Sequence, residues 1–256
     1  MTITVSGLAV TAVKGTRLRA VERVELDPDG ARGDRRFFVV DDKGRLVNAK
    51  QLGGLLAVLS DHLDGQLSLT FPDGTCAQGP ATLGERLTTR FYSEERGARI
   101  VEGPFAAALS EHLGRPLLLV EREGSIDRGP MGAASLVSRA SLAELAAHCR
   151  EPDVDARRFR MLIEVDGVAA HAEDGWVGQQ LQVGQAVVHW RGHVGRCLIT
   201  SRHPETGAVD LPTLDVLGDY RGRIDATEPL PFGIYGEVVR PGAITVGDSV
   251  VPARSL

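Results

Sequence analysis

Short apolar runs separated by glycine and proline turns are the feature that most constrains this chain. Its 256 residues include 30 glycines and 13 prolines, and glycine exceeds its average share of about 7%. In the first hundred residues the runs VSGLAV, VERVEL, RFFVVDD, LAVLS and LSLTF alternate with the turn sequences DPDGARGD, DKG and PDG. The clearest hairpin is RFFVVDDKGRLV, which turns at Asp42, Lys43 and Gly44. Such runs predict many short strands rather than long helices.

The same pattern returns after about residue 156. The predicted strands there lie within RFRMLIEVDG, LQVGQAVVHW, CLITSRH and YGEVVRPGAITVGDSVVPA. Many short strands with glycine and proline turns favour closed β-barrels over an open sheet. We therefore predict a mainly β fold with some α-helix, in the α+β class, whose two β-rich parts are divided between residues 120 and 155.

Two helices are predicted near that division. GPFAAALSEHLG fits an amphipathic helix that Gly114 ends. SRASLAELAAHC offers Ser138 or Ser141 as the N-cap, and Ser141 with Glu144 has the spacing of a capping box. Between the helices, PLLLVER indicates a strand and EGSIDRGPMGAAS an irregular loop.

Charge and hydropathy bear on partners and location. The formal net charge of −5 disfavours a nucleic-acid partner, because phosphate binding needs a concentrated basic surface. The sequence contains no stretch of about 18 apolar residues, the length that a membrane-spanning helix needs. The start MTITVSGLAV lacks the basic region of a secretory signal. We expect a cytoplasmic protein with no membrane partner.

The three cysteines differ in context. Their odd number and the lack of a CxxC pair indicate neither a disulfide framework nor a structural zinc site. Cys149 ends a predicted helix, where a half-buried small residue is expected, and Cys76 lies in a turn-like segment. Cys197 stands out because Arg196 and His193 are close in sequence, and nearby cations favour the reactive thiolate. The alternative is an inert, buried cysteine at the start of a strand.

Few familiar catalytic motifs are present. The chain has no GxxxxGK[ST], no GxGxxG that opens a helix and no HExxH, which leaves nucleotide binding and zinc-peptidase chemistry unsupported. A cysteine hydrolase would need a histidine aligned with Cys197, and sequence proximity alone does not establish that geometry. The histidines nearest in sequence are His189, His193 and His203.

Two arginine clusters adjoin apolar strands. ARGDRRFF contains Arg32, Arg35 and Arg36, and DARRFRML contains Arg157, Arg158 and Arg160. A guanidinium can bind phosphate or carboxylate oxygens through two parallel hydrogen bonds. The other interpretation is solvated strand ends with surface ion pairs.

Read together, several segments resemble the MOSC-domain proteins. They are AVKG (12–15), GDRRFFVVDDKGRLVNAKQ (33–51), RRFRMLIEVDG (157–167), AEDGW (172–176), VGRCLITSRHPETG (194–207), PFGIYG (231–236) and PGAITVGD (241–248). The likeness is to the branch with an N-terminal MOSC β-barrel domain, which includes the amidoxime-reducing components and bacterial relatives. It implies an N-terminal MOSC β-barrel domain over residues 1–120 and a MOSC β-barrel domain over 121–256, connected through a small helical region.

The resemblance also implies a site. The molybdenum-ligating cysteine of the family falls on Cys197, which would bind as a soft thiolate. The matching positions for binding the anionic molybdenum cofactor, a molybdopterin, are Lys14, Arg35 and Arg160, with Tyr235 near the site. Asp174 and Trp176 match a motif that we interpret as structural. Pyridoxal phosphate binding is a weaker label attached to such domains.

Three departures from the family pattern concern this site. Gly15 replaces a serine, and Leu162 replaces an asparagine. Pro130, Met131 and Gly132 stand where the family has Asp-Thr-Ser. Ser135 or main-chain N–H groups of the glycine-rich loop could replace the lost donors.

The resemblance implies an oxidoreductase that reduces small N-oxygenated substrates. The electrons would come from a separate reductase, because no flavin or haem motif is visible and three cysteines cannot ligate a ferredoxin-type cluster. A second hypothesis is a non-catalytic carrier of the cofactor or of sulfur, which would use Cys197 as a docking site or persulfide. A third is a degenerate barrel that has lost the cofactor.

Overall fold

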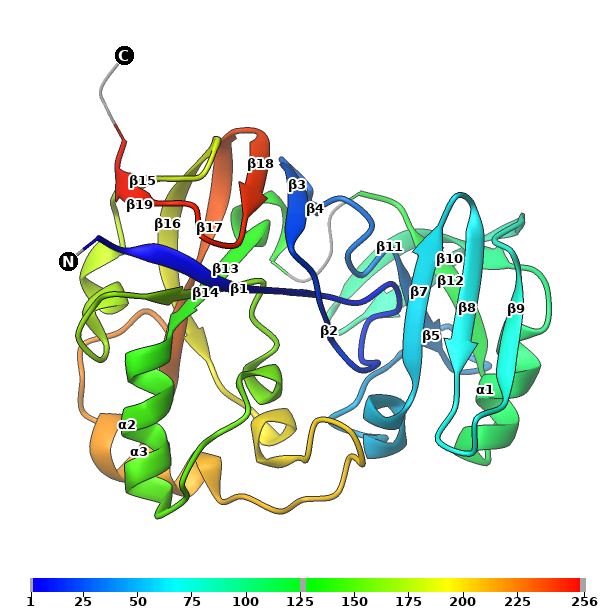
Figure 1. Ribbon diagram of the computed structural model, residues 1–256. Helices are drawn as coiled ribbons and strands as arrows, with labels where there is room; N and C mark the ends of the chain where they lie inside the picture. The colour runs from blue at the N-terminus through cyan, green and yellow to red at the C-terminus, as the bar shows by residue number, and fades with distance from the viewer. Residues whose placement is uncertain (1, 125–127, 254–256) are drawn as a thin grey trace.

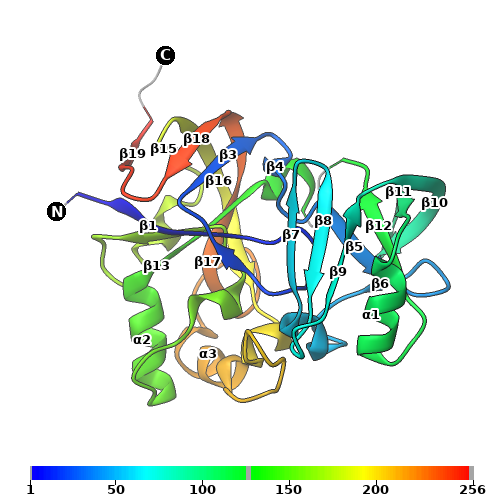
Figure 2. The ribbon, with the colours of Figure 1, turned by 45° about the vertical axis from the view of Figure 1, so that its right-hand side comes forward.

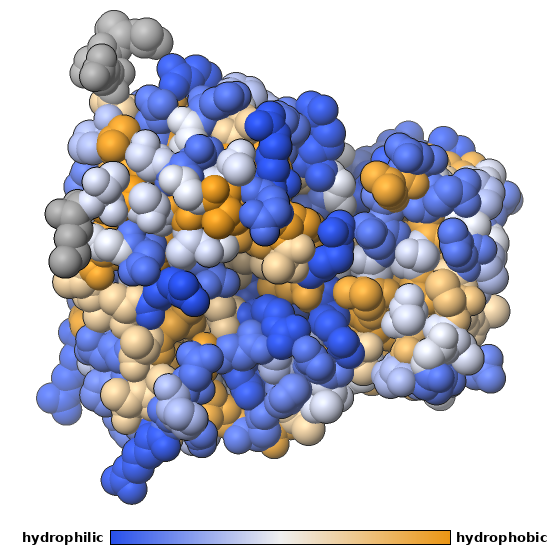
Figure 3. Space-filling view, viewed as in Figure 1, coloured by the Kyte–Doolittle hydropathy of each residue, from blue (hydrophilic) through white to orange (hydrophobic). Residues whose placement is uncertain are grey.

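The computed structural model describes residues 2–124 and 128–253. The chain forms two lobes that lie side by side, with both termini on the larger one (Figures 1 and 2). In the space-filling view the molecule narrows between the lobes (Figure 3). None of the helices in the described ranges is long and apolar enough to cross a membrane.

The larger lobe is built on an eight-stranded sheet in the order β19-β15-β16-β17-β13-β14-β1-β2. Its strands are β1 (Thr4–Val10), β2 (Arg19–Ala20), β13 (Ala134–Ser138), β14 (Ile163–Asp166), β15 (Gln180–Val183), β16 (Ala186–Gly195), β17 (Pro231–Arg240) and β19 (Val250–Pro252). A three-stranded sheet adds β3 (Arg23–Asp27), β4 (Gly30–Ala31) and β18 (Gly242–Thr245). The core between them includes the fully buried Trp190. Because successive side chains of a strand point to opposite faces of the sheet, alternate apolar residues of these strands face this core.

The smaller lobe contains two sheets. One has the order β10-β11-β12-β5-β6 and the other β7-β8-β9. The strands are β5 (Phe37–Val40), β6 (Leu46–Val47), β7 (Leu59–Leu63), β8 (Gln66–Thr70), β9 (Cys76–Pro80), β10 (Leu83–Phe91), β11 (Glu94–Val101) and β12 (Leu118–Arg122). A short 3-10 helix, η1 (Gly53–Ala57), and the helix α1 (Phe105–Leu113) complete the lobe. Gly114 ends α1 in the left-handed conformation, as predicted.

The first thirty residues cross between the lobes. Strand β1 pairs with β14 of the larger lobe. The chain then bridges to the smaller lobe at Val13–Phe37 and Arg17–Leu59, and returns to pair β3 with β18. Residues 12–17 therefore lie at the junction of the lobes.

The helices of the larger lobe differ from prediction in two respects. Helix α2 (Arg139–Cys149) is capped by Ser138, whose hydroxyl accepts the Ser141 N–H. The predicted Ser141–Glu144 capping box is wrong, because the Ser141 hydroxyl instead donates to buried Glu173 at 2.7 Å. Helix α3 (Thr213–Arg221) was not predicted, and it packs against α2.

The predicted strand CLITSRH is also wrong. Strand β16 ends at Gly195, and after Cys197 the chain forms a 3-10 turn, η5 (Leu198–Ser201). The Thr200 hydroxyl donates to the Cys197 carbonyl at 3.1 Å, and the Ser201 hydroxyl pairs with that of Thr213 at 2.7 Å. Such local side-chain bonds compete with strand pairing. The mainly β architecture with three α-helices in the described ranges still confirms the predicted α+β class.

Candidate functional site

A pocket of about 340 Å³ lies between the lobes, within the range of small-molecule sites. Its walls come from residues 14–15, 35, 48–50 and 92, and from residues 128, 132, 135, 159–161, 194–197, 199 and 235. The second set includes the last residue of η2 (Gly129–Gly132) and the last residue of η3 (Ala156–Phe159). Both lobes are needed to enclose the pocket.

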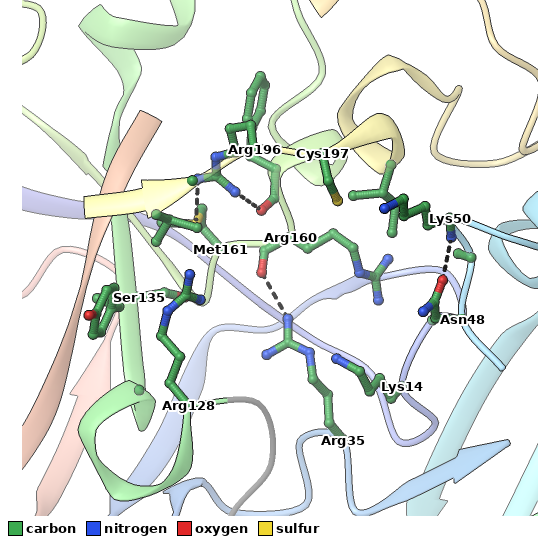
Figure 4. A pocket seen from close by; sticks show the side chains of 18 of the residues that line it. Lys14, Arg35, Asn48, Lys50, Arg128, Ser135, Arg160, Met161, Arg196 and Cys197 are labelled. Carbon is green, nitrogen blue, oxygen red and sulfur yellow. Dashed lines mark hydrogen bonds between the residues drawn. The ribbon is translucent and has the colours of Figure 1, made fainter. Parts of the chain in front are cut away.

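The pocket contains all five residues predicted for the site. Cys197, Lys14, Arg35, Arg160 and Tyr235 all line it. Cys197 is exposed, and in Figure 4 its sulfur points into the space that the side chains of Lys14, Arg35 and Arg160 also enter. The structure thus brings together residues far apart in sequence, and their roles as ligands remain a prediction.

Arg35 and Arg160 are joined to each other and to the main chain. Arg35 donates one hydrogen bond to the Asp34 carboxylate and another to the Arg160 carbonyl, each at 2.8 Å. Arg160 donates to the Thr16 carbonyl at 2.8 Å. Both arginines have a left-handed backbone, with φ of 47° and 56°. This conformation is uncommon for residues other than glycine and often occurs at functional sites.

The remaining arginines of the two clusters serve as ion-pair partners. Their pairs are Arg32–Asp27, Arg36–Glu121, Arg157–Asp155, Arg157–Glu205 and Arg158–Asp210. Each cluster therefore sends one guanidinium into the pocket. Arg32 and Arg36 are exposed, as the surface interpretation expects, whereas Arg157 is half-buried and Arg158 is buried.

The loop that carries Lys14 rests on a buried hydroxyl network. Thr11, Thr16 and Ser60 bond to one another at 2.7–3.0 Å, and the Ser60 hydroxyl also accepts the Val13 N–H at 3.0 Å. Gly15 has φ +95°, a conformation that disfavours any residue with a side chain. Serine is therefore disfavoured at this position in this backbone.

Arg196 and His193 do not face Cys197 as a catalytic pair would. Arg196 donates to the carbonyls of Phe159 and Phe232, each at 2.8 Å. Burial lowers the pKa of its guanidinium, and repulsion from Arg128 adds to that shift. The His193 Nε2 lies 3.7 Å from Asp174, and no histidine occurs among the described residues of the pocket wall. A histidine-activated thiol is therefore not supported.

The departures from the family pattern have distinct structural consequences. Leu162 is 3% exposed and belongs to the core, while its N–H donates to the Ser135 hydroxyl at 3.0 Å. Of Pro130, Met131 and Gly132, only Gly132 lines the pocket, and Met131 is 56% exposed. Ser135 does line it, as anticipated for a replacement donor.

Several wall residues were missed in the sequence. Asn48, Lys50 and Arg128 line the pocket, and so does Arg196, which the sequence singled out only as a neighbour of Cys197. Arg128 forms a two-pronged ion pair with Glu228 and covers the ring of Tyr235 at 4.5 Å. Arg128 precedes the altered glycine-rich loop, and Lys50 lies within the VNAKQ segment. Their closeness to these family-like segments was the only sequence feature that could have pointed to them. Their contacts include residues far away in the chain, which the spacing of residues in the sequence does not reveal.

The pocket is strongly cationic. Six lysine and arginine residues line it. Three belong to the predicted set, Lys14, Arg35 and Arg160, and the other three are Lys50, Arg128 and Arg196. None of its described lining residues is acidic, although the whole chain has a net charge of −5. Such a pocket favours an anionic ligand.

Asp174 and Trp176 lie outside this wall. Asp174 pairs with Arg221 of α3 at 2.6 Å, and Trp176 packs on the core of the larger lobe. Neighbouring Glu173 accepts the Ser138 N–H at the start of α2. These contacts support the structural interpretation of the segment.

Comparison with known families adds to this geometry. The MOSC domain model matches residues 123–251, and the MOSC N-terminal beta barrel domain model matches residues 2–116. The chain therefore belongs to the MOSC-domain family, in the group with an N-terminal β-barrel domain.

Several curated relatives are named mitochondrial amidoxime-reducing components. The chain is 25% identical to mitochondrial amidoxime-reducing component 1 of Xenopus laevis, over 96% of this chain and 81% of that protein. It is 35% identical to component 2 of Bos taurus, over 45% of this chain and 35% of that protein. Among solved structures, the YUAD protein of Bacillus subtilis aligns over 98% of this chain and 94% of its own, with a TM-score of 0.47 and 13% identity.

Proposed function

We propose that the pocket binds the molybdenum cofactor and that the protein reduces small N-oxygenated compounds. One observation carries this proposal: the exposed thiol of Cys197 opens into a pocket that Lys14, Arg35 and Arg160 enter from three other segments. Similarity to amidoxime-reducing components supports the substrate class. A cytoplasmic location, a separate electron donor and the weaker pyridoxal phosphate label remain predictions.

The donor set fits a metal held by an anionic organic group. A thiolate is a soft ligand of the kind that binds such metals, and Cys197 is the one cysteine at the pocket. Guanidinium groups bind phosphate oxygens well. The described wall contains no carboxylate, which would repel a phosphate. The backbone at Gly15 adds a surface without a side chain beside Lys14.

The chain's own residues would bind and orient. Cys197 Sγ would hold the metal, while Lys14, Arg35 and Arg160 would hold the pterin phosphate. Arg128 and Tyr235 would close one wall through their stacked contact. When bound, the cofactor supplies two-electron redox chemistry. Overall, the N–O bond breaks, two electrons arrive from the separate reductase, two protons are taken up, and the oxygen leaves as water.

Metal analysis tests this proposal. Protein produced in a host that makes the cofactor should contain about one equivalent of molybdenum, and Cys197→Ala less than about a tenth. The unchanged protein should also reduce benzamidoxime with an artificial electron donor, and Cys197→Ser should not. Metal-free wild-type protein that Cys197→Ala leaves unaltered would instead indicate the degenerate barrel, in which replacing Lys14, Arg35 or Arg160 by alanine changes only stability.

A cofactor or sulfur carrier is the second candidate. The altered loop favours it, because Met131 faces solvent and the described wall offers no carboxylate to move a proton. Tight cofactor binding without turnover of benzamidoxime would support the carrier. A persulfide on Cys197, detected by mass spectrometry, would indicate the sulfur-carrying form.

A further inference from the structure

Lys50 is a pocket residue with no role in the proposed cofactor site. It lies on the smaller lobe between β6 and η1 and is exposed. Among the described residues, no carboxylate lies within ion-pair distance of its amine, whereas Arg35 pairs with Asp34 and Arg128 with Glu228. The ammonium of Lys50 is therefore available to a ligand in the pocket.

The main chain of Lys50 is fixed from two directions. The Asn48 side-chain oxygen accepts the N–H of Lys50 at 3.0 Å and that of Gln51 at 3.3 Å. Arg202 donates to the Lys50 carbonyl at 3.2 Å. Arg202 immediately follows the η5 turn that starts after Cys197. This hydrogen bond connects the Lys50 segment to the loop that carries the thiol.

The side chain extends from that segment toward Cys197. In Figure 4 Lys50 approaches the sulfur from the side of Asn48, whereas the side chains of Lys14 and Arg35 enter from another part of the wall. An ammonium on a flexible stem can direct three hydrogen-bond donors at a small ligand. It is thus placed beside the predicted reaction centre and apart from two of the predicted phosphate-binding cations.

We propose that Lys50 binds the oxygen atom of the substrate, an inference that rests on the proposed function. Hydrogen bonds from a charged donor are strongest when the acceptor is also charged. The oxygen of an amine N-oxide carries a formal negative charge, and that of an amidoxime is neutral. Lys50 therefore makes the site favour N-oxides and orients the N–O bond toward Cys197. It touches the substrate and does not hold the cofactor.

Steady-state kinetics on the cofactor-loaded protein test this role. With an artificial donor, Lys50→Met should raise KM for pyridine N-oxide roughly tenfold, raise KM for benzamidoxime less, and leave kcat and molybdenum content close to wild type. Lys50→Arg should restore most of the affinity because it keeps the charge. Lys43→Met is the matched control, since Lys43 is an exposed lysine of the β5–β6 turn outside the pocket.

Each other outcome has a defined meaning. Equal KM values for Lys50→Met and Lys43→Met would overturn the role of Lys50 while leaving the proposed function intact. Loss of molybdenum from Lys50→Met would overturn it by making Lys50 a cofactor ligand. Wild-type activity on benzamidoxime but none on pyridine N-oxide would overturn the N-oxide preference. Wild-type protein inactive on both compounds would count against the proposed function itself.

Discussion

Arg35 donates a hydrogen bond of 2.8 Å to the main-chain carbonyl of Arg160, across 125 residues of sequence. The bond joins the wall formed by the smaller lobe to the wall formed by the larger one. Its donor also pairs with Asp34, whose other oxygen accepts the Thr11 N–H at 2.9 Å. One arginine thus contributes both to the charge of the pocket and to the contact that closes it.

Replacing Arg35 should lower stability even without cofactor. Arg35→Met leaves the Asp34 carboxylate, 8% exposed, without its cation, and breaking such a buried pair costs about 3 kcal/mol. Urea unfolding of the metal-free protein measures the change. Arg32→Met is the control, because the Arg32–Asp27 pair is exposed and should contribute less than about 1 kcal/mol. Equal losses in both variants would contradict the structural role.

Gly15→Ala should weaken cofactor binding. The backbone φ of +95° is strained for alanine, at a cost of about 1–3 kcal/mol, and relaxation of the loop would move Lys14 from the pocket. Reduced molybdenum content in the purified variant would show this. Gly65→Ala, at φ +76° in the distant β7–β8 turn, should lose stability but keep its metal. Full metal content in Gly15→Ala would refute the predicted displacement of Lys14.

His171 should make stability depend on pH. Burial lowers its pKa, and Arg221 lowers it further against the opposing Glu173, Asp174 and Glu144. In the unfolded chain the His171 imidazole takes up a proton near pH 6.5, whereas in the folded chain it does so only at lower pH. The free energy of unfolding should therefore fall as pH drops below about 6.5. The ring also packs against Tyr220 and Phe232. Within the part of the chain that the structure describes, neither ring nitrogen has a hydrogen-bond partner, and Nε2 lies 4.0 Å from the Glu144 carboxylate.

His171→Asn should flatten this dependence, and asparagine tolerates the left-handed backbone of this residue. Urea unfolding between pH 5.5 and 7.5 is the measurement. Part of the slope should remain, because burial also lowers the pKa of His62 in the smaller lobe. Superimposable pH profiles for wild type and His171→Asn would disprove the assignment.

The sequence was most informative where local rules and tertiary packing agree. The hairpin turn at Gly44 and the helix end at Gly114 were predicted correctly, because each needs a glycine with positive φ. The strand predicted at Cys197 failed because hydroxyls of Thr200, Ser201 and Thr213 stabilise a turn there, and two of these bonds link residues twelve or more apart.

The predicted pocket residues came from the family resemblance and not from spacing. Arg35 and Arg160 look no different in sequence from their neighbours Arg36 and Arg158. Their left-handed backbone distinguishes them from Arg36 and Arg158, and no local sequence pattern predicts that conformation. Lys50 was missed for a related reason: one of the two contacts that fix its main chain comes from Arg202, which is 152 residues away.

The crossing of the first thirty residues between the lobes has a consequence for assembly. A fragment that began at residue 121 would lack β1 and β3, so β14 would become an edge strand and β18 would lose its neighbour. The arm that carries Lys14 is thus fastened at both ends to the lobe that carries Cys197. Neither half of the gene encodes an autonomous binding site, and a split protein would regain the cavity only by reassociation of its two pieces.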